Sequence, residues 1–234
     1  MGCGSAFGGF ALFADLSVMR QDELKGRYIN MLFELNKSFS RYKKVKKTNL
    51  HDIGCTEKQL EKLVSANIRD FIYTEDLFTI FTERQFQEEP DIIALDKNGD
   101  MYIFELKRWS SSQENLLQVL GYGQKFGQYN YDKLSELYRK KFYSNDNNYN
   151  YMQLKIDHSE YFNIDKENEL REVDFNKKQN FILLVNGLDV ETINAIIYWK
   201  NNGISIEAII YFVYNIDNRY YLEFSPYSKY KEIH

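Results

Sequence analysis

Two short apolar runs joined by a tight polar turn constrain the fold of this chain more than any other feature. Residues 91–95 (DIIAL) and 100–107 (DMYIFELK) flank the tetrapeptide DKNG at 96–99. That tetrapeptide is typical of a type I turn followed by a glycine bulge. We therefore expect a β-hairpin whose register pairs Ile93 with Ile103.

The same register gathers charged side chains at one end of an otherwise apolar face. Asp91 is expected opposite Glu105, and Lys107 follows on that face because side chains alternate along a strand. Like charges placed directly opposite each other destabilise a sheet, so the two acids need a compensating cation. Lys107 supplies part of that compensation, and hard oxygen donors of this kind suit Mg²⁺ or Mn²⁺.

A helix is expected to precede the hairpin, because Thr56 and Gln59 form a capping box. Six apolar residues then share one helix face: Leu60, Leu63, Val64, Ile68, Phe71 and Ile72. Glu61 falls inside that arc, where a carboxylate is rarely buried without a partner. Two interpretations stay open. Glu61 either reaches water or pairs with Lys58 or Lys62, or it is a third acid facing the charged end of the hairpin.

The remaining chain favours an α/β fold, a mixed sheet with helices on its faces. The chain after Tyr73 is expected to be irregular until the hairpin, and the polar stretch at about 128–178 is expected to carry one or two helices. The other expected elements are helices at 110–126 and 189–201 and strands at 181–185, 206–215 and 219–224.

Residues 1–55 are expected to form a leader and a helical extension. From Gln21 to Lys44, apolar side chains recur at heptad-like spacing: Tyr28, Leu32, Leu35, Phe39 and Tyr42. Such a seam packs on its own domain or on a second copy, so a homodimer through residues 20–45 is one expectation. The end of this segment is basic: Lys37, Arg41, Lys43, Lys44, Lys46 and Lys47.

Composition excludes several classes of protein. With 44% hydrophobic residues the 234-residue chain has enough apolar side chains for a core. No apolar run approaches the roughly 20 residues of a membrane span. Two distant cysteines and three histidines form no zinc or serine-triad motif, and a reducing, cytoplasmic compartment is the expectation. The net charge of −4 argues mildly against a nucleic-acid partner.

The hairpin and its neighbours carry a resemblance to a known family. Pro90-Asp91 followed by Glu105-Leu106-Lys107 resembles the core of the PD-(D/E)xK nuclease superfamily, in which Asp91, Glu105 and Lys107 match the three charged positions. Glu61 matches the acid that many members place on the preceding helix.

Later segments extend this resemblance over about residues 56–226. Gln118 and Tyr122 lie on one helix face and match a Q-x-x-x-Y element of several branches. Asn176 and Gln179, the strand at 181–185, Trp199 and the strand at 204–210 resemble one branch, which includes uncharacterised bacterial proteins and a branched-DNA endonuclease.

The resemblance implies a restriction-endonuclease-like α/β/α core with a mixed central sheet over residues 56–230, with an insertion at about 128–178. It also implies a Mg²⁺-dependent (or Mn²⁺-dependent) deoxyribonuclease, a phosphodiester hydrolase acting as an endonuclease in antiviral defence, restriction or repair. Asp91 and Glu105 would be metal ligands, with the Leu106 carbonyl as a third. Glu61 would bind the metal through water or hold a second ion.

The other site residues would act on water and nucleic acid. Lys107 would orient the attacking water, and Gln118 and Tyr122 would position phosphate or Lys107. DNA contacts are expected from six residues: Lys43, Lys44, Lys46, Lys47, Arg108 and Trp109. The alternative for the basic run is a solvated helix end, as most charge runs are, and the alternative for Trp109 is a packing role. Two alternatives to a deoxyribonuclease remain: an RNA-directed nuclease, and a nucleic-acid-binding or assembly subunit without turnover.

Overall fold

The structure is a computed structural model that describes residues 32–71, 76–82, 89–111, 113–144 and 149–226. The chain divides into two compact units, Met1–Lys44 and Val45–His234, which are described separately. Within the described residues, no helix is long and apolar enough to cross a membrane.

The first unit contains a small antiparallel hairpin rather than a helix. Strands β1 (Phe33–Leu35) and β2 (Tyr42–Lys44) pair so that Leu35 faces Tyr42. The expected helical extension is therefore wrong over residues 32–44, and the part of the prediction that covers 21–31 lies outside the described residues. The physical reason is turn chemistry: the Asn36 carboxamide accepts hydrogen bonds from the backbone N–H groups of Ser40 and Arg41 at 2.9 and 3.1 Å, which reverses the chain.

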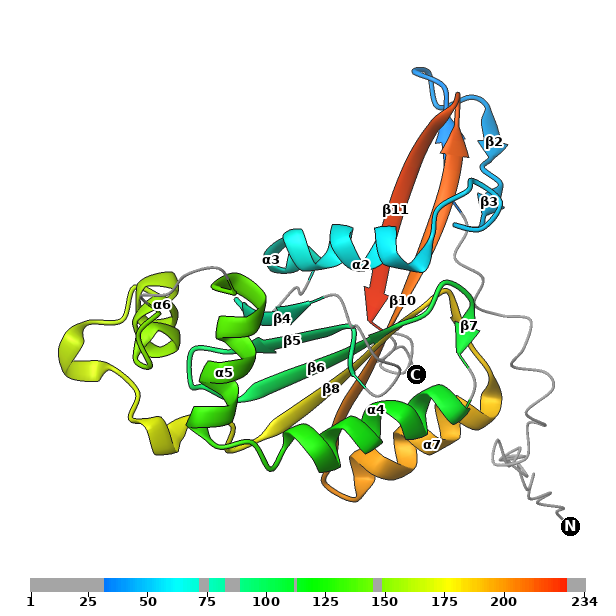
Figure 1. Cartoon of the computed structure of the whole chain (residues 1–234). Coiled ribbons are helices and arrows are strands. Elements are labelled where there is room, and N and C mark those ends of the chain that lie inside the picture. Colours follow the sequence, from blue (N-terminus) through cyan, green and yellow to red (C-terminus); the bar gives the residue numbers. More distant parts are fainter. Residues whose placement is uncertain (1–31, 72–75, 83–88, 112, 145–148, 227–234) are drawn as a thin grey trace, which may run out of the picture. The chain divides into compact units, whose positions relative to one another are not determined.

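A mixed sheet forms the centre of the second unit (Figure 1). Its strand order is β11-β10-β8-β6-β5-β4, with β3 pairing beside β10. Strand β8 runs parallel to both β6 and β10, and the other neighbours are antiparallel. The strands are β3 (Lys47–Thr48), β4 (Phe78–Thr82), β5 (Ile92–Leu95), β6 (Met101–Leu106), β8 (Gln179–Val185), β10 (Ser205–Ile216) and β11 (Arg219–Pro226). A separate short pair consists of β7 (Ser110–Ser111) and β9 (Gly187–Leu188).

Helices cover both faces of this sheet, which confirms the expected α/β/α arrangement. Helix α2 (Glu57–Ala66), followed by α3 (Ile68–Phe71), packs against β4 and β6 on one face. On the other face, α4 (Gln113–Phe126) packs against β6 and β8, α7 (Val190–Asn201) packs against β10 and α4, and α5 (Tyr131–Phe142) packs against β4 (Figure 1).

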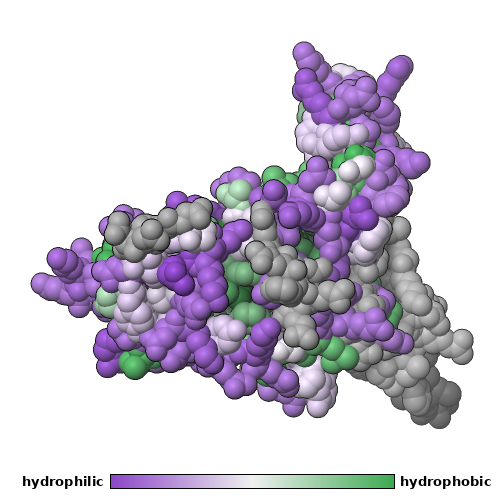
Figure 2. All heavy atoms as spheres, viewed as in Figure 1, coloured by the Kyte–Doolittle hydropathy of each residue, from purple (hydrophilic) through white to green (hydrophobic). Residues whose placement is uncertain are grey.

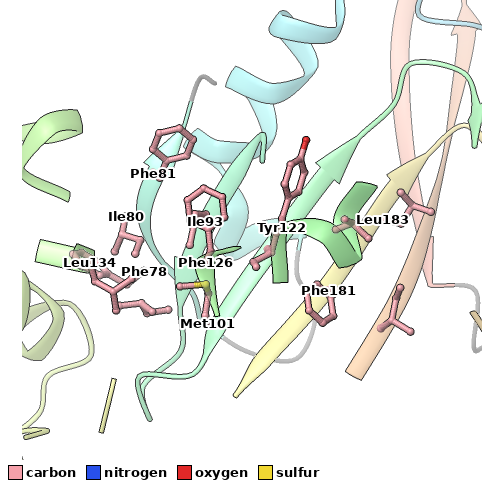
Figure 3. Packing of buried hydrophobic residues seen from close by; sticks show 14 of the residues in the cluster. Phe78, Ile80, Phe81, Ile93, Met101, Tyr122, Phe126, Leu134, Phe181 and Leu183 are labelled. Atoms are coloured by element: carbon pink, nitrogen blue, oxygen red, sulfur yellow. The ribbon is translucent and has the colours of Figure 1, made fainter. Parts of the chain in front are cut away.

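Each face of the sheet contributes to its own hydrophobic cluster. Strand alternation sends Ile93 and Ile103 into the cluster under α4 and α5, and sends Phe104 and Leu106 into the cluster under α2. Figure 3 shows the first cluster, in which Ile93 and Met101 of the hairpin face Phe126 of α4 and the aromatic residues of β4 and β8.

The hairpin of β5 and β6 has the expected register. Ile93 pairs with Ile103 and Leu95 with Met101. Gly99 has a φ of +80°, and a Cβ there would meet the Asp174 carbonyl oxygen at 3.2 Å, so the turn requires glycine at this position. The expected irregular stretch after Tyr73 is wrong over Phe78–Thr82, which forms β4.

The polar stretch between β6 and β8 is helical and rich in tyrosine. It holds α5, α6 (Gln153–Tyr161) and two short 3₁₀ turns, Lys166–Asn168 and Glu172–Asp174. The Asp157 carboxylate joins the two helices by accepting hydrogen bonds from the hydroxyls of Tyr138 and Tyr143 at 2.8 and 2.6 Å. Its outer surface is mainly hydrophilic (Figure 2).

Candidate active site

The regular pairing of β5 with β6 starts at Ile92, the residue after Asp91, and this sets the position of the Asp91 carboxylate. The last ladder pair is Ile92 with Phe104. Pro90 has no N–H to continue the ladder, and the Asp91 N–H donates to the Phe104 carbonyl at 3.2 Å. The Asp91 carboxylate instead accepts from the Leu106 N–H at 2.7 Å. The expected direct pairing of Asp91 with Glu105 is therefore not formed, although both acids lie at the same end of the hairpin.

Glu105 is a charged residue in the centre of the sheet. It lies on β6, pairs with Leu183 of β8 and is 0% exposed. Its carboxylate forms an ion pair with the Lys107 ammonium. A carboxylate at this depth carries a large desolvation penalty unless it is paired, and the Lys107 ammonium offsets part of that penalty. This agrees with the compensation expected from the sequence.

Lys107 is fixed through both its backbone and its side chain. Its N–H donates to the Leu184 carbonyl at 2.9 Å, and its own carbonyl accepts from the Tyr211 hydroxyl at 3.0 Å. Burial raises the pKa of the Tyr211 phenol, which therefore stays protonated as a donor at neutral pH. The Lys107 ammonium lies 3.7 Å from a Glu57 carboxylate oxygen. The site lysine is thus held between two carboxylates, Glu105 and Glu57.

Glu57 and Tyr211 are the residues that sequence reasoning missed. Glu57 lies in the first turn of α2, and its second carboxylate oxygen accepts from the Arg108 N–H at 3.2 Å. Its spacing of four from Glu61 was a usable signal, since residues i and i+4 share a helix face. Nothing in the sequence singles out Tyr211 among the tyrosines of a long apolar strand.

Glu61, for which two interpretations were open, is buried, with 6% of its surface exposed. Within the described part of the chain, no three His, Cys, Asp or Glu side chains are grouped closely enough to hold a metal ion. Glu61 is therefore not drawn into one cluster with both Asp91 and Glu105. It lies on α2, one helical turn beyond Glu57, whose carboxylate lies near the Lys107 ammonium.

Gln118 and Tyr122 meet on α4, as their spacing predicted. The Gln118 amide donates to the Tyr122 hydroxyl at 2.5 Å. The Tyr122 ring is buried in the cluster under α4, and Figure 3 shows its hydroxyl directed away from Met101 and Phe181. The polar pair therefore lies at the margin of an apolar core rather than in its middle.

Arg108 and Trp109, which follow Lys107, differ in how far their side chains are already held by other groups of the protein. The Arg108 guanidinium donates to the Cys55 carbonyl at 3.1 Å and lies 4.2 Å from the Trp109 ring centre, so it ties the end of β6 to the segment before α2. Trp109 is 52% exposed, with the His51 ring at 5.9 Å. About half of the Trp109 surface is exposed to solvent, whereas the Arg108 guanidinium is hydrogen-bonded to the Cys55 carbonyl.

The four lysines expected to contact DNA are not on a helix. Lys43 and Lys44 are exposed on β2 of the first unit, and Lys46 is exposed just before β3. Lys47 is half-buried on β3, with its ammonium 3.6 Å from the Phe212 ring centre. Lys47 therefore has a packing role within the second unit.

Comparisons with known proteins find likeness at the level of fold. No family model matches the sequence, and no curated protein matches it. Among solved structures, the chain is similar to the EndoMS-dsDNA2 complex, with 14% identity, a TM-score of 0.36, and coverage of 66% of this chain and 44% of that chain. It is also similar to a repair endonuclease from Pyrococcus abyssi, with 13% identity, a TM-score of 0.35, and coverage of 66% and 47%. The matched part spans less than half of each of those chains.

Proposed function

We propose that this chain is a metal-dependent nuclease that hydrolyses DNA phosphodiester bonds as an endonuclease. One observation carries the proposal. A fully buried glutamate, Glu105, is paired with Lys107 at the end of a central strand, and the Asp91 carboxylate is hydrogen-bonded to the intervening residue, Leu106. Buried ionised groups cost folding free energy, and buried charges held in place by an opposite charge often mark functional sites.

The chemistry of the donors fits Mg²⁺ or Mn²⁺. Asp91 and Glu105 supply hard carboxylate oxygens, and the Leu106 carbonyl is a third protein donor within the same segment. Mg²⁺ keeps several waters and is commonly held by one or two carboxylates together with substrate phosphate, so a third acid is not required. When bound, the metal would lower the pKa of a coordinated water and neutralise phosphate charge.

The chain's own residues would orient the reactants. The Leu106 N–H holds one oxygen of Asp91, which fixes the carboxylate's direction. Lys107, held between Glu105 and Glu57, would donate to the attacking water and to the phosphate oxygens as negative charge develops on them. Glu61 would hold outer waters, Gln118 and Tyr122 would position phosphate, and the exposed Trp109 ring would stack on a base.

Three substitutions of similar shape test the assignment: Asp91→Asn, Glu105→Gln and Lys107→Met. Each should lower Mg²⁺- or Mn²⁺-dependent cleavage of plasmid DNA by about 100-fold or more, as expected for groups that act directly on the reacting atoms. Glu167→Gln and Lys166→Ala, which change exposed residues of a 3₁₀ turn, are the matched controls and should cleave normally. Thermal melting of every variant separates lost chemistry from lost folding. Near-normal cleavage by any of the three would overturn the site.

A second candidate function is a nucleic-acid-binding or assembly subunit without turnover. It is favoured by the absence of a three-acid cluster in the described residues, because the Glu105–Lys107 pair is then also consistent with a purely structural ion pair.

Metal binding and cleavage assays separate the two candidates. If the metal binds at Asp91 and Glu105, Mn²⁺ should raise the unfolding midpoint of the wild type but not of Glu105→Gln. DNA binding with no cleavage of plasmid, single-stranded DNA or RNA under either metal would favour this candidate, and cleavage of RNA alone would change the substrate class.

A further inference from the structure

The turn of the β1–β2 hairpin presents an aromatic side chain in an unfavourable backbone conformation. Phe39 has a φ of +55°, in the left-handed region that residues with a Cβ rarely adopt. The side chain is 79% exposed, the most exposed of the large hydrophobic residues described. Burial therefore offsets little of the cost of this conformation. Strain kept at an exposed position is an observation that points to function.

The surrounding turn enforces this presentation. The Phe39 N–H donates to the Asn36 carbonyl at 2.9 Å, and the Asn36 N–H donates to the Arg41 carbonyl at 3.2 Å. The Asn36 carboxamide accepts from two further backbone N–H groups and donates to the Ser40 hydroxyl at 3.1 Å. Hydrogen bonds within the loop therefore fix its conformation, and Phe39 lies at its tip.

The charge around the ring identifies the chemistry of a partner. Residues 32–44 contain four cations, Lys37, Arg41, Lys43 and Lys44, and one acid, although the whole chain has a net charge of −4. That acid, Glu34, lies 4.0 Å from Lys43 on one face of the hairpin. Lys37 and Arg41 flank the tip, where both are exposed. This distribution is complementary to a polyanion.

We propose that this hairpin is a nucleic-acid contact in which Phe39 stacks on one unpaired or unstacked base while Lys37 and Arg41 contact the flanking phosphates. The Phe39 ring between Lys37 and Arg41 matches one base and its backbone. A lipid surface fits less well, because Phe39 is the one apolar residue of the loop at 36–41 and the loop's backbone groups would lose water. The proposal deepens the proposed function and rests on it for the class of ligand.

Binding in EDTA tests the proposal without cleavage. Fluorescence anisotropy of the full chain would compare three labelled DNAs: a single strand, a perfect duplex and a duplex with one unpaired base. Phe39→Gly should weaken binding to the single strand and to the unpaired-base duplex by roughly tenfold, the scale of one base–aromatic stack, and change perfect-duplex binding little. Phe39→Trp should restore the affinity. Because glycine suits a positive φ, Phe39→Gly should leave the unfolding midpoint unchanged or higher.

Two controls make the result specific to the hairpin. Tyr198→Ala removes another exposed aromatic ring, on α7, and should bind every DNA normally. Lys37→Gln together with Arg41→Gln should reduce the slope of log affinity against log salt by about 0.7–0.9 for each phosphate that the hairpin no longer neutralises.

Three outcomes would overturn the proposal: a loss of affinity in Phe39→Gly, relative to the wild type, that is absent or is the same for all three DNAs, loss of affinity in Tyr198→Ala as large as in Phe39→Gly, or a change of oligomeric state in Phe39→Gly with DNA binding unaffected. The last would assign the tip to contact with a second copy. These results are distinguishable from failure of the nuclease assignment. DNA binding that depends on the hairpin but occurs without cleavage would refute only the nuclease assignment. Cleavage with binding that does not depend on the hairpin would refute only the hairpin contact.

Discussion

At the scale of single residues, small backbone details decide where charged side chains lie. The sequence predicted that Asp91, Glu105 and Lys107 gather at one end of the hairpin, and the Glu105–Lys107 ion pair was anticipated from charge compensation. The direct pairing of Asp91 with Glu105 was not correctly predicted, because it assumed a regular ladder through Pro90. The role of Glu57 depends on how α2 docks on β6, which a pattern along one helix does not encode.

His158 is a buried titratable residue that the candidate site does not use. It is 0% exposed, its Nε2 lies 2.8 Å from the Asp96 carbonyl oxygen, and the rings of Phe162 and Phe175 lie at 4.8 and 5.3 Å. Burial lowers its pKa below the ordinary value of 6.5. The imidazole is therefore neutral in the fold and donates its Nε2 proton to the carbonyl.

This lowered pKa predicts acid destabilisation. Well above pH 6.5 both the folded and unfolded states hold a neutral His158, so the residue adds no pH dependence there. As the pH falls below 6.5, the unfolded state takes up the proton first and folding stability is lost until the folded-state pKa is reached. Urea unfolding between pH 5 and 8 should show a smaller decrease in stability for His158→Gln than for the wild type. An identical pH dependence of the two proteins would contradict the neutral buried imidazole.

At the scale of elements, turn and capping residues predicted the structure correctly, whereas a hydrophobic repeat alone did not. The DKNG turn fixed the register of β5 and β6, and the capping box correctly located the start of α2. The heptad-like seam failed over 32–44 because Leu35 and Tyr42, seven apart, are also cross-strand partners in the hairpin. Strand β4 was missed although its sequence, FTIFT, is rich in β-branched and aromatic residues.

Two glycines of α4 allow a matched test of helix packing. A Cβ at Gly121 would meet nothing within 4 Å, whereas a Cβ at Gly123 would lie 2.5 Å from the Phe181 ring. Gly121→Ala should stabilise the protein by about 0.8–1 kcal/mol through helix propensity. Gly123→Ala has the same propensity gain but must displace a core ring, which costs about 1–3 kcal/mol, so its stability should fall to the wild-type value or below.

Denaturant unfolding of both alanine variants measures the difference directly, since the two substitutions are chemically identical and two residues apart. Equal stabilisation by both would show that Phe181 moves aside without cost and that the packing of α4 on β8 is looser than described.

At the scale of the whole molecule, the two described hydrophobic clusters consist of residues from the second unit alone. The sequence predicted this α/β core, since strand and helix patterns over residues 56–226 were strong. It did not predict the boundary, because Val45 and Leu50, both buried, were assigned to a helical extension. Aromatic residues make up 16% of the chain, and Tyr138 of α5 and Tyr143 directly after it explain part of this content, since their ring centres lie 5.5 Å apart and their hydroxyls donate to Asp157.

A fragment beginning at Val45 is therefore expected to fold. Removing Met1–Lys44 should leave the unfolding midpoint and the cooperativity of the second unit close to those of the full chain, because its described core residues all remain. Circular dichroism melting of fragment and full chain makes the comparison. A large drop in the midpoint, or a broad transition, would show that the first unit contributes to the stability of the core.

The parallel pairing of β6 with β8 has a consequence for how the site comes into being during synthesis. Glu105 is paired with Leu183, so the strand that covers it is made long after the strand that carries it. Such long-range parallel pairings close slowly because a large loop must be ordered first. Until the residues up to Val185 have left the ribosome, the nascent chain lacks the strand that pairs with Glu105. It also lacks the Leu184 carbonyl that accepts the Lys107 N–H. The charged site is therefore a late product of translation, completed after α5 and α6 have been made.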